Sequence, residues 1–170
     1  MILMRHGDAL KGDSDPVRAL SKKGIGEGEA AGAFLRSIGE FPDIILHSTL
    51  LRSIQTAERV EAELGANGLL RERRDLKPED SEKKFLSDVL TEYEEYTGSN
   101  YTIMVVGHNP FISDLAALLG YALPFTTGTL FAAESFMPEK MWDICFYVKA
   151  RHLRKDRVKT FEAGKVSAGE

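Results

Sequence analysis

The chain has 170 residues, of which 43% are hydrophobic and 28% are charged, and its formal net charge at pH 7 is −4. This length suits one domain with a sizeable core, and the composition is that of an ordinary globular protein. The net negative charge argues against broad nucleic-acid binding, and no apolar stretch is as long as a membrane span.

The cysteine content and the first residues indicate the cellular compartment. The single cysteine, Cys145, cannot form an internal disulfide, and its alternating apolar surroundings predict a buried thiol rather than a nucleophile. Arg5 and His6 interrupt the apolar run that begins the chain, so no secretory signal is expected. We therefore expect a cytoplasmic protein with no membrane partner.

The sequence pattern predicts strands that alternate with helices. In chain order the predicted elements are a strand over 1–5, a loop over 8–20, a helix over 21–38, a strand over 44–46, a helix over 50–64, a short strand over 69–73, a helix from 81 closed by residues 98–100, a strand over 101–106, a helix over 110–119, and strands over 129–136 and 142–150 joined by a turn at Pro138. Ser21 and Ser81 stand where helix N-caps belong, and Gly65 ends the second helix. Asn109 is expected to cap the fourth helix, with Pro110 at its first position.

This alternation is typical of an α/β fold with a largely parallel sheet. We expect a single domain over residues 1–158 and a frayed tail over 159–170. The basic stretch at 151–159 is interpreted as a solvated terminal segment rather than a partner-binding tail.

Polar clusters follow three of the predicted strands. Arg5 and His6 follow the first strand, residues 47–52 follow the second, and residues 107–110 follow the strand over 101–106. Because ligands of α/β folds bind beyond the carboxyl ends of the strands, these clusters are expected to form one site.

The clusters supply Arg5, His6, Arg52 and His108, which together suit phosphoryl transfer. The guanidinium groups can hold phosphoryl oxygens, and a neutral histidine can attack phosphorus. The other histidine would donate a hydrogen bond to the phosphoryl group as the cation, because a nearby anion favours the charged form. These residue types alone do not decide which histidine attacks. Each residue taken singly also fits a structural role, such as a surface ion pair or a helix cap, but four of them at matching strand ends favour a site.

Metal binding fits the sequence poorly. The four histidines show no H-x-H or H-E-x-x-H spacing, and two arginines beside the candidates would repel a cation. We expect neither a metal nor another cofactor.

Four short motifs occur in order along the chain: M-R-H-G at 4–7, L-S-K-K-G at 20–24, S-T-L-L-R-S-I-Q-T-A at 48–57 and V-G-H-N-P at 106–110. By order and spacing over residues 1–135, they resemble the histidine phosphatase superfamily, which has the phosphoglycerate mutase-like fold. The resemblance implies three α/β/α layers around a mostly parallel mixed sheet. It also implies that His6 is the phosphorylated nucleophile, that Arg5, Arg52 and His108 form the phosphate pocket, and that no metal takes part.

Within the superfamily the chain looks like the small SixA-type phosphohistidine phosphatases. The features that carry this likeness are R-H-G-D-A at 5–9, V-R-A-L-S at 17–21, F-T-T-G at 125–128 and the compact length. The likeness also suggests that Arg18 reaches the phosphate from its loop.

The chain departs from the wider family in its acidic residues. Mutases and many phosphomonoesterases of the superfamily carry an acid in a Gly-x-Trp-Glu-like motif, which this chain lacks. Glu79, Asp80 and Glu82 are candidates without a recognisable context, and Asp8 is expected to hydrogen-bond the loop at 12–13 instead. An alcohol leaving group needs a proton, whereas the weak P–N bond of phosphohistidine needs less help, so the departure favours phosphoramidate substrates.

The leading hypothesis is a monomeric phosphatase that removes phosphate from phosphohistidine on a protein through a covalent intermediate on His6. The first alternative is a small-molecule phosphomonoesterase of the same superfamily, with Glu79 or Asp80 as the acid. The second is a non-catalytic phosphate-binding protein, which would form no phosphoenzyme.

Overall fold

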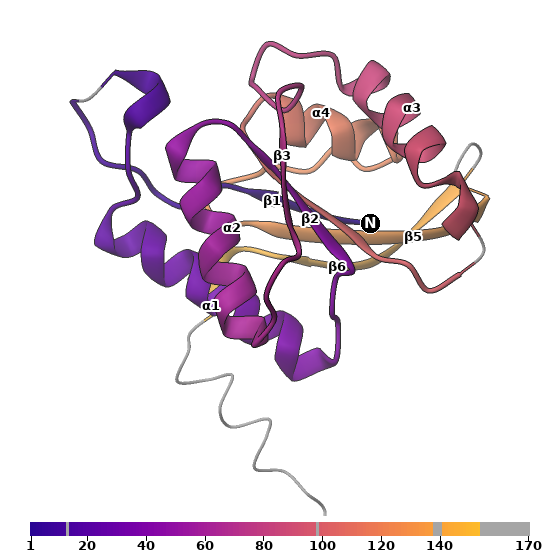
Figure 1. Ribbon diagram of the computed structural model, residues 1–170, viewed down its shortest axis with the longest axis horizontal. Helices are drawn as coiled ribbons and strands as arrows, with labels where there is room; N and C mark the ends of the chain where they lie inside the picture. The colour runs from indigo at the N-terminus through magenta and orange to yellow at the C-terminus, as the bar shows by residue number, and fades with distance from the viewer. Residues whose placement is uncertain (13, 98, 138–140, 154–170) are drawn as a thin grey trace, which may run out of the picture.

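A six-stranded mixed sheet lies at the centre of the computed structural model, in the order β3-β2-β4-β1-β5-β6 (Figure 1). The structure describes residues 1–12, 14–97, 99–137 and 141–153. The strands are β1 (Ile2–Arg5), β2 (Ile44–Ser48), β3 (Leu70–Arg73), β4 (Ile103–Gly107), β5 (Leu130–Met137) and β6 (Met141–Val148). The first four strands are paired in parallel, whereas β5 pairs antiparallel with both β1 and β6. The predicted mostly parallel mixed sheet is therefore confirmed.

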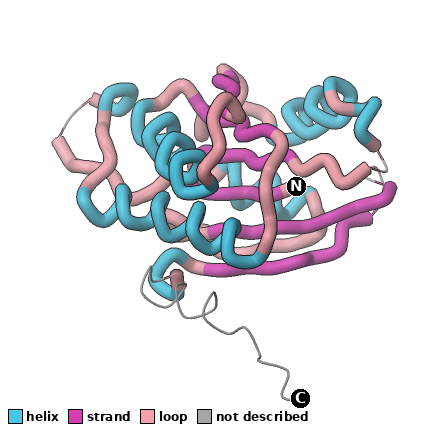
Figure 2. The backbone as a smooth tube through the Cα atoms, turned by 60° about the horizontal axis from the view of Figure 1, so that its bottom comes forward, coloured by secondary structure: helices cyan, strands magenta, loops and turns pink. Residues whose placement is uncertain are grey.

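Helices cover both faces of this sheet (Figures 1 and 2). They are α1 (Lys22–Ile38), α2 (Leu51–Leu64), α3 (Glu82–Glu92) and α4 (Phe111–Leu118), and short 3₁₀ helices span Asp15–Val17, Glu94–Tyr96 and Ala150–His152. Buried side chains of α1 and α2 form one core cluster with the sheet, and those of α3 and α4 form the other. The expected three α/β/α layers are confirmed.

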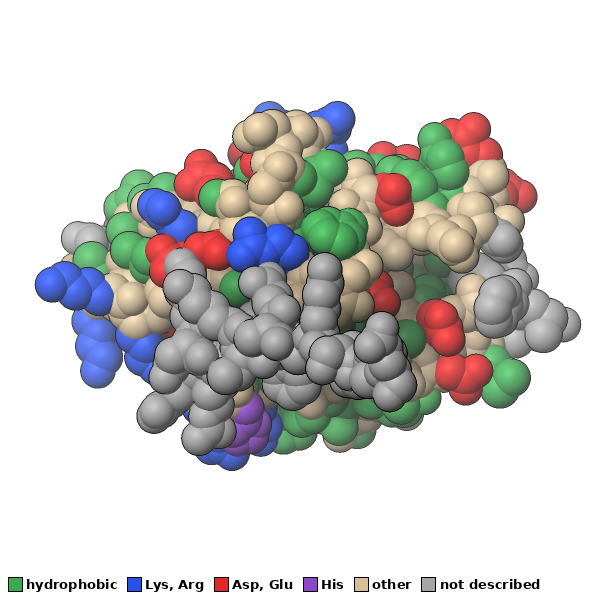
Figure 3. All heavy atoms as spheres, turned by 90° about the horizontal axis from the view of Figure 1, so that it is seen from below, with side chains coloured by type: hydrophobic (Ala, Val, Ile, Leu, Met, Phe, Trp, Pro, Cys, Tyr) green, Lys and Arg blue, Asp and Glu red, His purple; other side chains and the backbone are tan. Residues whose placement is uncertain are grey.

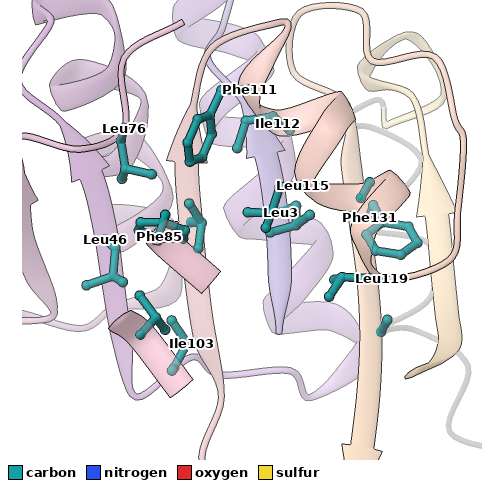
Figure 4. Packing of buried hydrophobic residues seen from close by; sticks show 14 of the residues in the cluster. Leu3, Leu46, Leu76, Phe85, Ile103, Phe111, Ile112, Leu115, Leu119 and Phe131 are labelled. Atoms are coloured by element: carbon teal, nitrogen blue, oxygen red, sulfur yellow. The ribbon is translucent and has the colours of Figure 1, made fainter. Parts of the chain in front are cut away.

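The central strands supply side chains to both cores in alternation. Leu3 of β1 packs with α3 and α4, as Figure 4 shows, whereas its neighbours Ile2 and Met4 pack on the opposite face with α1 and α2. A strand that is covered on both faces is apolar throughout, which explains why the opening run of the sequence shows no alternation.

Glycines determine how closely α1 and α2 pack. A Cβ atom at Gly32 of α1 would lie 2.6 Å from the carbonyl oxygen of Val60, and one at Gly28 would lie 2.9 Å from Cβ of Arg59. The glycines weaken helix propensity, but here they let two helix backbones approach each other. The predicted capping by Ser21 is confirmed, since its Oγ accepts a hydrogen bond from Gly24 N at 3.2 Å.

The prediction for the start of the fourth helix is wrong. Helix α4 begins at Phe111, Pro110 occupies the N-cap position without a side-chain cap, and the Asn109–Pro110 peptide is cis. The Asn109 amide instead donates a hydrogen bond to the Phe125 carbonyl oxygen at 2.9 Å. Its side chain therefore ties the end of β4 to the segment that precedes β5.

The prediction that Cys145 is buried is also wrong. Its strand, β6, lies at the edge of the sheet, and its side chain is exposed. Ala132 pairs with Phe146 and the next residue, Ala133, pairs with Ile144, so Cys145 is the extra residue of a β-bulge. A bulge interrupts the alternation of inward-facing and outward-facing side chains along the strand, and the apolar pattern of the sequence did not reveal it.

Other expectations for the connecting segments have mixed outcomes. Ser81 caps α3 as predicted, but the helix ends at Glu92 and a 3₁₀ helix follows it. The predicted turn at Pro138 and the predicted tail over 159–170 lie outside the described residues. Within the described part of the chain, no helix is both long and apolar enough to cross a membrane.

Candidate active site

The carboxyl ends of β1 and β4 and the start of α2 bring two histidines and an arginine together. His6 N donates a hydrogen bond to the Gly107 carbonyl oxygen at 2.9 Å. This bond joins the residue that follows β1 to the last residue of β4. The ring centroids of His6 and His108 are 4.9 Å apart, and Nε of Arg52 lies 3.2 Å from Nε2 of His6. Residues of three separate sequence motifs thus form one cluster, as their positions after the strands predicted.

Two motif glycines allow the loop after β1 to approach α1. A Cβ atom at Gly7 would lie 2.5 Å from the Gly24 carbonyl oxygen, and one at Gly24 would lie 2.0 Å from the Asp8 carbonyl oxygen. Real Cβ atoms do not approach backbone this closely, so a side chain at either position would displace the loop. The close approach explains why the motifs at 4–7 and 20–24 both need glycine.

Hydrogen bonds fix the tautomer of His6. Its Nδ1 lies 2.7 Å from the Gly7 carbonyl oxygen, which can only accept, so Nδ1 carries the proton. Its Nε2 therefore bears the lone pair and accepts the hydrogen bond from Arg52 Nε. The nitrogen with the lone pair faces the guanidinium group of Arg52, and the residue is only 7% exposed.

Arg52 is held at the start of α2 by contacts on every arm of its guanidinium group. Nη1 donates to the Asp15 carbonyl oxygen at 2.8 Å, and Nη2 donates to Oδ2 of the same residue at 3.1 Å. Thr56, one turn further along α2, donates from Oγ1 to the Arg52 carbonyl oxygen at 2.6 Å and accepts from Gly7 N at 3.0 Å. Arg52 is thereby fixed relative to the loop that carries His6.

Arg18 and Arg5 complete the cationic part of the cluster. Nη2 of Arg18 lies 3.3 Å from Oδ1 of Asp15, and the charge of Arg18 lowers the pKa of both His6 and His108. Nη1 of Arg5 donates to the Phe125 carbonyl oxygen at 2.9 Å. The structure brings together Arg5, Arg52, His6 and His108, the set expected from the strand ends, and Arg18, which the family resemblance suggested, lies beside them.

Several buried nitrogen atoms in this cluster have no hydrogen-bond partner among the described residues. They are Nε of Arg5, Nε of Arg18 and both ring nitrogens of His108. Buried polar groups are normally hydrogen-bonded, so unpaired nitrogens at one place favour a ligand that supplies oxygen acceptors. A phosphoryl group has that chemistry.

Burial and neighbouring charge keep both histidines neutral at pH 7. Burial, followed by the charges of Arg52, Arg5 and Arg18, lowers the pKa of His6 to about 4 against the opposing hydrogen bond to Gly7. Burial, His6 and the same arginines lower the pKa of His108 to about 2. Our expectation of a cationic histidine concerns the phosphate-bound state, and without the anion both rings are neutral.

The acidic candidates have partners of their own. The Asp8 carboxylate accepts a hydrogen bond from Ser21 Oγ at 2.6 Å and lies 3.9 Å from Nζ of Lys23, so it holds the start of α1, whereas residue 13 of its expected partner loop lies outside the described residues. Oδ2 of Asp80 accepts from Lys77 N at 2.7 Å, and Glu79 is exposed. Glu82, the remaining candidate, lies in the first turn of α3.

Two other acids at the site were missed by sequence reasoning. Asp15 contacts Arg52 and Arg18, and the available signal was its position three residues before Arg18. Glu27, which is almost buried, accepts hydrogen bonds from Asp8 N at 2.8 Å and Thr127 Oγ1 at 3.2 Å. It ties the loop after β1 to the segment before β5.

Neither a metal centre nor a separate surface pocket competes with this cluster. In the described ranges, no group of three or more His, Cys, Asp or Glu side chains could hold a metal ion. A pocket of about 470 Å³ lies at the opposite edge of the sheet, where Met1, Tyr101 and Trp142 are among its lining residues. We place the site at the histidines because the unpaired donors lie there.

Comparisons with known proteins agree with this arrangement. The family model of the histidine phosphatase superfamily (branch 1) matches residues 1–99. A 2,3-bisphosphoglycerate-dependent phosphoglycerate mutase of Tropheryma whipplei is 40% identical over 63 residues, which are 34% of this chain and only 28% of the mutase.

Solved structures extend the similarity over most of the chain. The protein histidine phosphatase SixA complexed with tungstate is 25% identical, with a TM-score of 0.80 over 90% of this chain and 98% of that one. A mycobacterial glucosyl-3-phosphoglycerate phosphatase with inorganic phosphate shares the fold at 17% identity, with a TM-score of 0.65 over 89% of this chain and 98% of that one. The chain therefore belongs to the histidine phosphatase superfamily.

Proposed function

We propose that the protein is a phosphatase that hydrolyses phosphohistidine on a protein through a covalent intermediate on His6, without a metal. The observation that carries this proposal is the lone pair of His6 Nε2, which faces the Arg52 guanidinium beside the unpaired nitrogens of His108. A neutral nucleophile, a cationic cluster and a second imidazole are the groups that phosphoryl transfer to histidine requires.

In the first step, Nε2 of His6 attacks phosphorus and forms an N–P bond as the P–N bond of the substrate breaks. The substrate ring, which carries a proton on its other nitrogen, leaves as a neutral imidazole with the electron pair of that bond. Arg5, Arg18, Arg52 and His108 donate hydrogen bonds to the phosphoryl oxygens. The phosphorylated ring gains positive charge, which the hydrogen bond from its Nδ1 to the Gly7 carbonyl oxygen stabilises.

In the second step, water attacks phosphorus, the N–P bond of the intermediate breaks, and inorganic phosphate leaves as H2PO4⁻ with both protons of the water. Nε2 of His6 then regains its lone pair. This cycle consumes one water and requires no redox partner.

The acids favour phosphohistidine over a phosphomonoester as the substrate. Among the acids of the described part of the chain, Asp8 accepts from Ser21 and Asp80 accepts from Lys77 N. The two acids at the site, Asp15 and Glu27, are held as acceptors by the arginines and by Asp8 N and Thr127. An alcohol leaving group needs a proton donor, whereas an imidazole leaving group depends on one far less. The similarity to a protein histidine phosphatase supports the same choice.

A small-molecule phosphomonoesterase is the second candidate. It is favoured by the shared fold with a glucosyl-3-phosphoglycerate phosphatase. We further propose that the protein acts as a monomer in the cytoplasm, with a phosphohistidine-bearing protein domain as its partner.

The test compares phosphate release from a phosphohistidine-bearing protein and from glycerol 3-phosphate, whose alkyl alcohol leaving group needs a proton. Wild type should turn over the former much faster, and His6→Ala should abolish both the release and the trapping of a phosphorylated enzyme. His152→Ala is the matched control, because His152 is exposed and outside the cluster. A preference for glycerol 3-phosphate would support the second candidate, and failure to trap phosphoenzyme on wild type would leave a phosphate-binding protein.

A further inference from the structure

The Asp15 carboxylate lies at the mouth of the candidate site, in contact with two of its arginines. Oδ2 lies 3.1 Å from Nη2 of Arg52, and Oδ1 lies 3.3 Å from Nη2 of Arg18. Asp15 belongs to the exposed 3₁₀ helix of the loop before α1, and its side chain is 58% exposed, whereas that of Arg52 is 4% exposed. A negative charge thus stands between the buried Arg52 guanidinium and solvent, beside the partly exposed Arg18.

The guanidinium group of Arg52 contacts both His6 and Asp15. Its Nε faces His6, where the phosphoryl group would bind, and its two terminal nitrogens are held by Asp15. The carboxylate offsets part of the positive charge that the three arginines would otherwise present to any anion. A ligand at the histidines is therefore close both to hydrogen-bond donors and to the negative charge of the Asp15 carboxylate.

We propose that Asp15 makes the site selective for phosphoryl groups whose carrier has no second anionic group beside the phosphorus. This inference rests on the proposed function and adds the class of substrate to it. A carboxylate or second phosphate next to the phosphoryl group would be repelled by Asp15, and it would find both terminal nitrogens of Arg52 and Nη2 of Arg18 already in contact with Asp15. A phosphohistidine side chain within a protein has no such neighbouring anion on the imidazole itself.

A purely structural role of Asp15 makes a different prediction. If the residue only anchored Arg52, its replacement would weaken the binding of all phosphoryl compounds by the same factor. Selectivity instead predicts a change in the ratio of affinities between two ligands that differ by one carboxylate.

The test measures the affinities of glycerol 3-phosphate and 3-phosphoglycerate by calorimetry, since these ligands differ by a carboxylate. Wild type is expected to prefer glycerol 3-phosphate. The isosteric variant Asp15→Asn should raise the relative affinity for 3-phosphoglycerate by about 5-fold at low salt, because one charge–charge repulsion at a partly exposed site is removed. The gain should shrink at about 0.5 M salt, because the exposed carboxylate is then screened.

The matched control is Glu58→Gln, which removes one negative charge from an exposed position of α2. It should leave the affinity ratio unchanged. An unchanged ratio in Asp15→Asn, an equal loss of both affinities, or an equal shift in Glu58→Gln would each overturn the proposal. These binding measurements require no turnover, so their outcome is independent of whether a phosphoenzyme can be trapped.

Discussion

The chemistry of His6 at the residue scale follows from its two hydrogen bonds and its surroundings. Nδ1 keeps its proton and donates it in a hydrogen bond to the Gly7 carbonyl oxygen, so the lone pair lies on Nε2. Nε2 accepts a hydrogen bond from Arg52 Nε and therefore faces the cationic cluster. Burial and three guanidinium groups oppose a charge on the ring. The sequence identified the residue type and its place after a strand, whereas its tautomer depends on contacts made within the folded chain.

Titration of His6 gives a residue-scale prediction. In the phosphate-free protein the imidazole should remain neutral through pH 6.5 and take up a proton only near pH 4, because its pKa is lowered to about 4. Chemical shifts of the ring carbon and hydrogen measured against pH by NMR would show this, with His6→Asn to assign the signal. A midpoint near pH 6.5 would contradict the burial of the ring.

The packing of α1 on α2 is decided at the scale of elements. Both Gly26 and Gly32 lie in α1, but a Cβ atom at Gly26 has nothing within 4 Å, whereas one at Gly32 would lie 2.6 Å from the Val60 carbonyl oxygen. Sequence periodicity recognised the helix but could not distinguish a glycine that faces solvent from one that faces a helix. The distinction matters because α1 and α2 carry Glu27 and Arg52 to the site.

These two glycines provide a matched pair of substitutions. Gly32→Ala should lower the free energy of unfolding by about 1–3 kcal/mol, because α2 must move away. Gly26→Ala should raise it by about 0.5–1 kcal/mol, because alanine favours the helix and restricts the unfolded chain. Urea denaturation followed by circular dichroism measures both. An unaffected Gly32→Ala would show that α1 and α2 pack less closely than the structure has them. A destabilised Gly26→Ala would show that Gly26 does not face solvent.

At the scale of the whole molecule, two core clusters on opposite faces of one sheet hold the site in place. Leu76, Phe111 and Ile112 pack beside the ends of the central strands on one face (Figure 4). On the face seen in Figure 3, basic side chains gather toward the left, whereas acidic side chains predominate toward the right.

The neutral histidines also predict how global stability depends on pH. In the unfolded chain a histidine takes up a proton near pH 6.5, whereas in the folded protein His6 does so only near pH 4. Between these values the unfolded state binds more protons, so stability is present above pH 6.5 and is lost as the pH falls. His6 alone should account for about 3 kcal/mol by pH 4.

Chemical denaturation at a series of pH values tests this dependence. The decline between pH 6.5 and 4 should be steeper for wild type than for His6→Asn, which lacks the titrating ring. Parallel curves for the two proteins would refute the assignment. His152→Ala should follow wild type, since that side chain is exposed.

The sequence by itself determined the order of the elements and the residues that gather at one edge of the sheet. Arg5, His6, Arg52 and His108 follow apolar strands or begin a helix, and the ends of parallel strands meet by geometry, so local patterns were sufficient. Only the tertiary structure decided the contacts of Asp15, Asn109 and Cys145. Asp15 binds an arginine 37 residues away, Asn109 binds a carbonyl 16 residues away, and a bulge against β5 exposes Cys145. Hydrogen bonds and pairing over such separations depend on how elements approach in space, and the periodicity of a single segment carries no record of that approach.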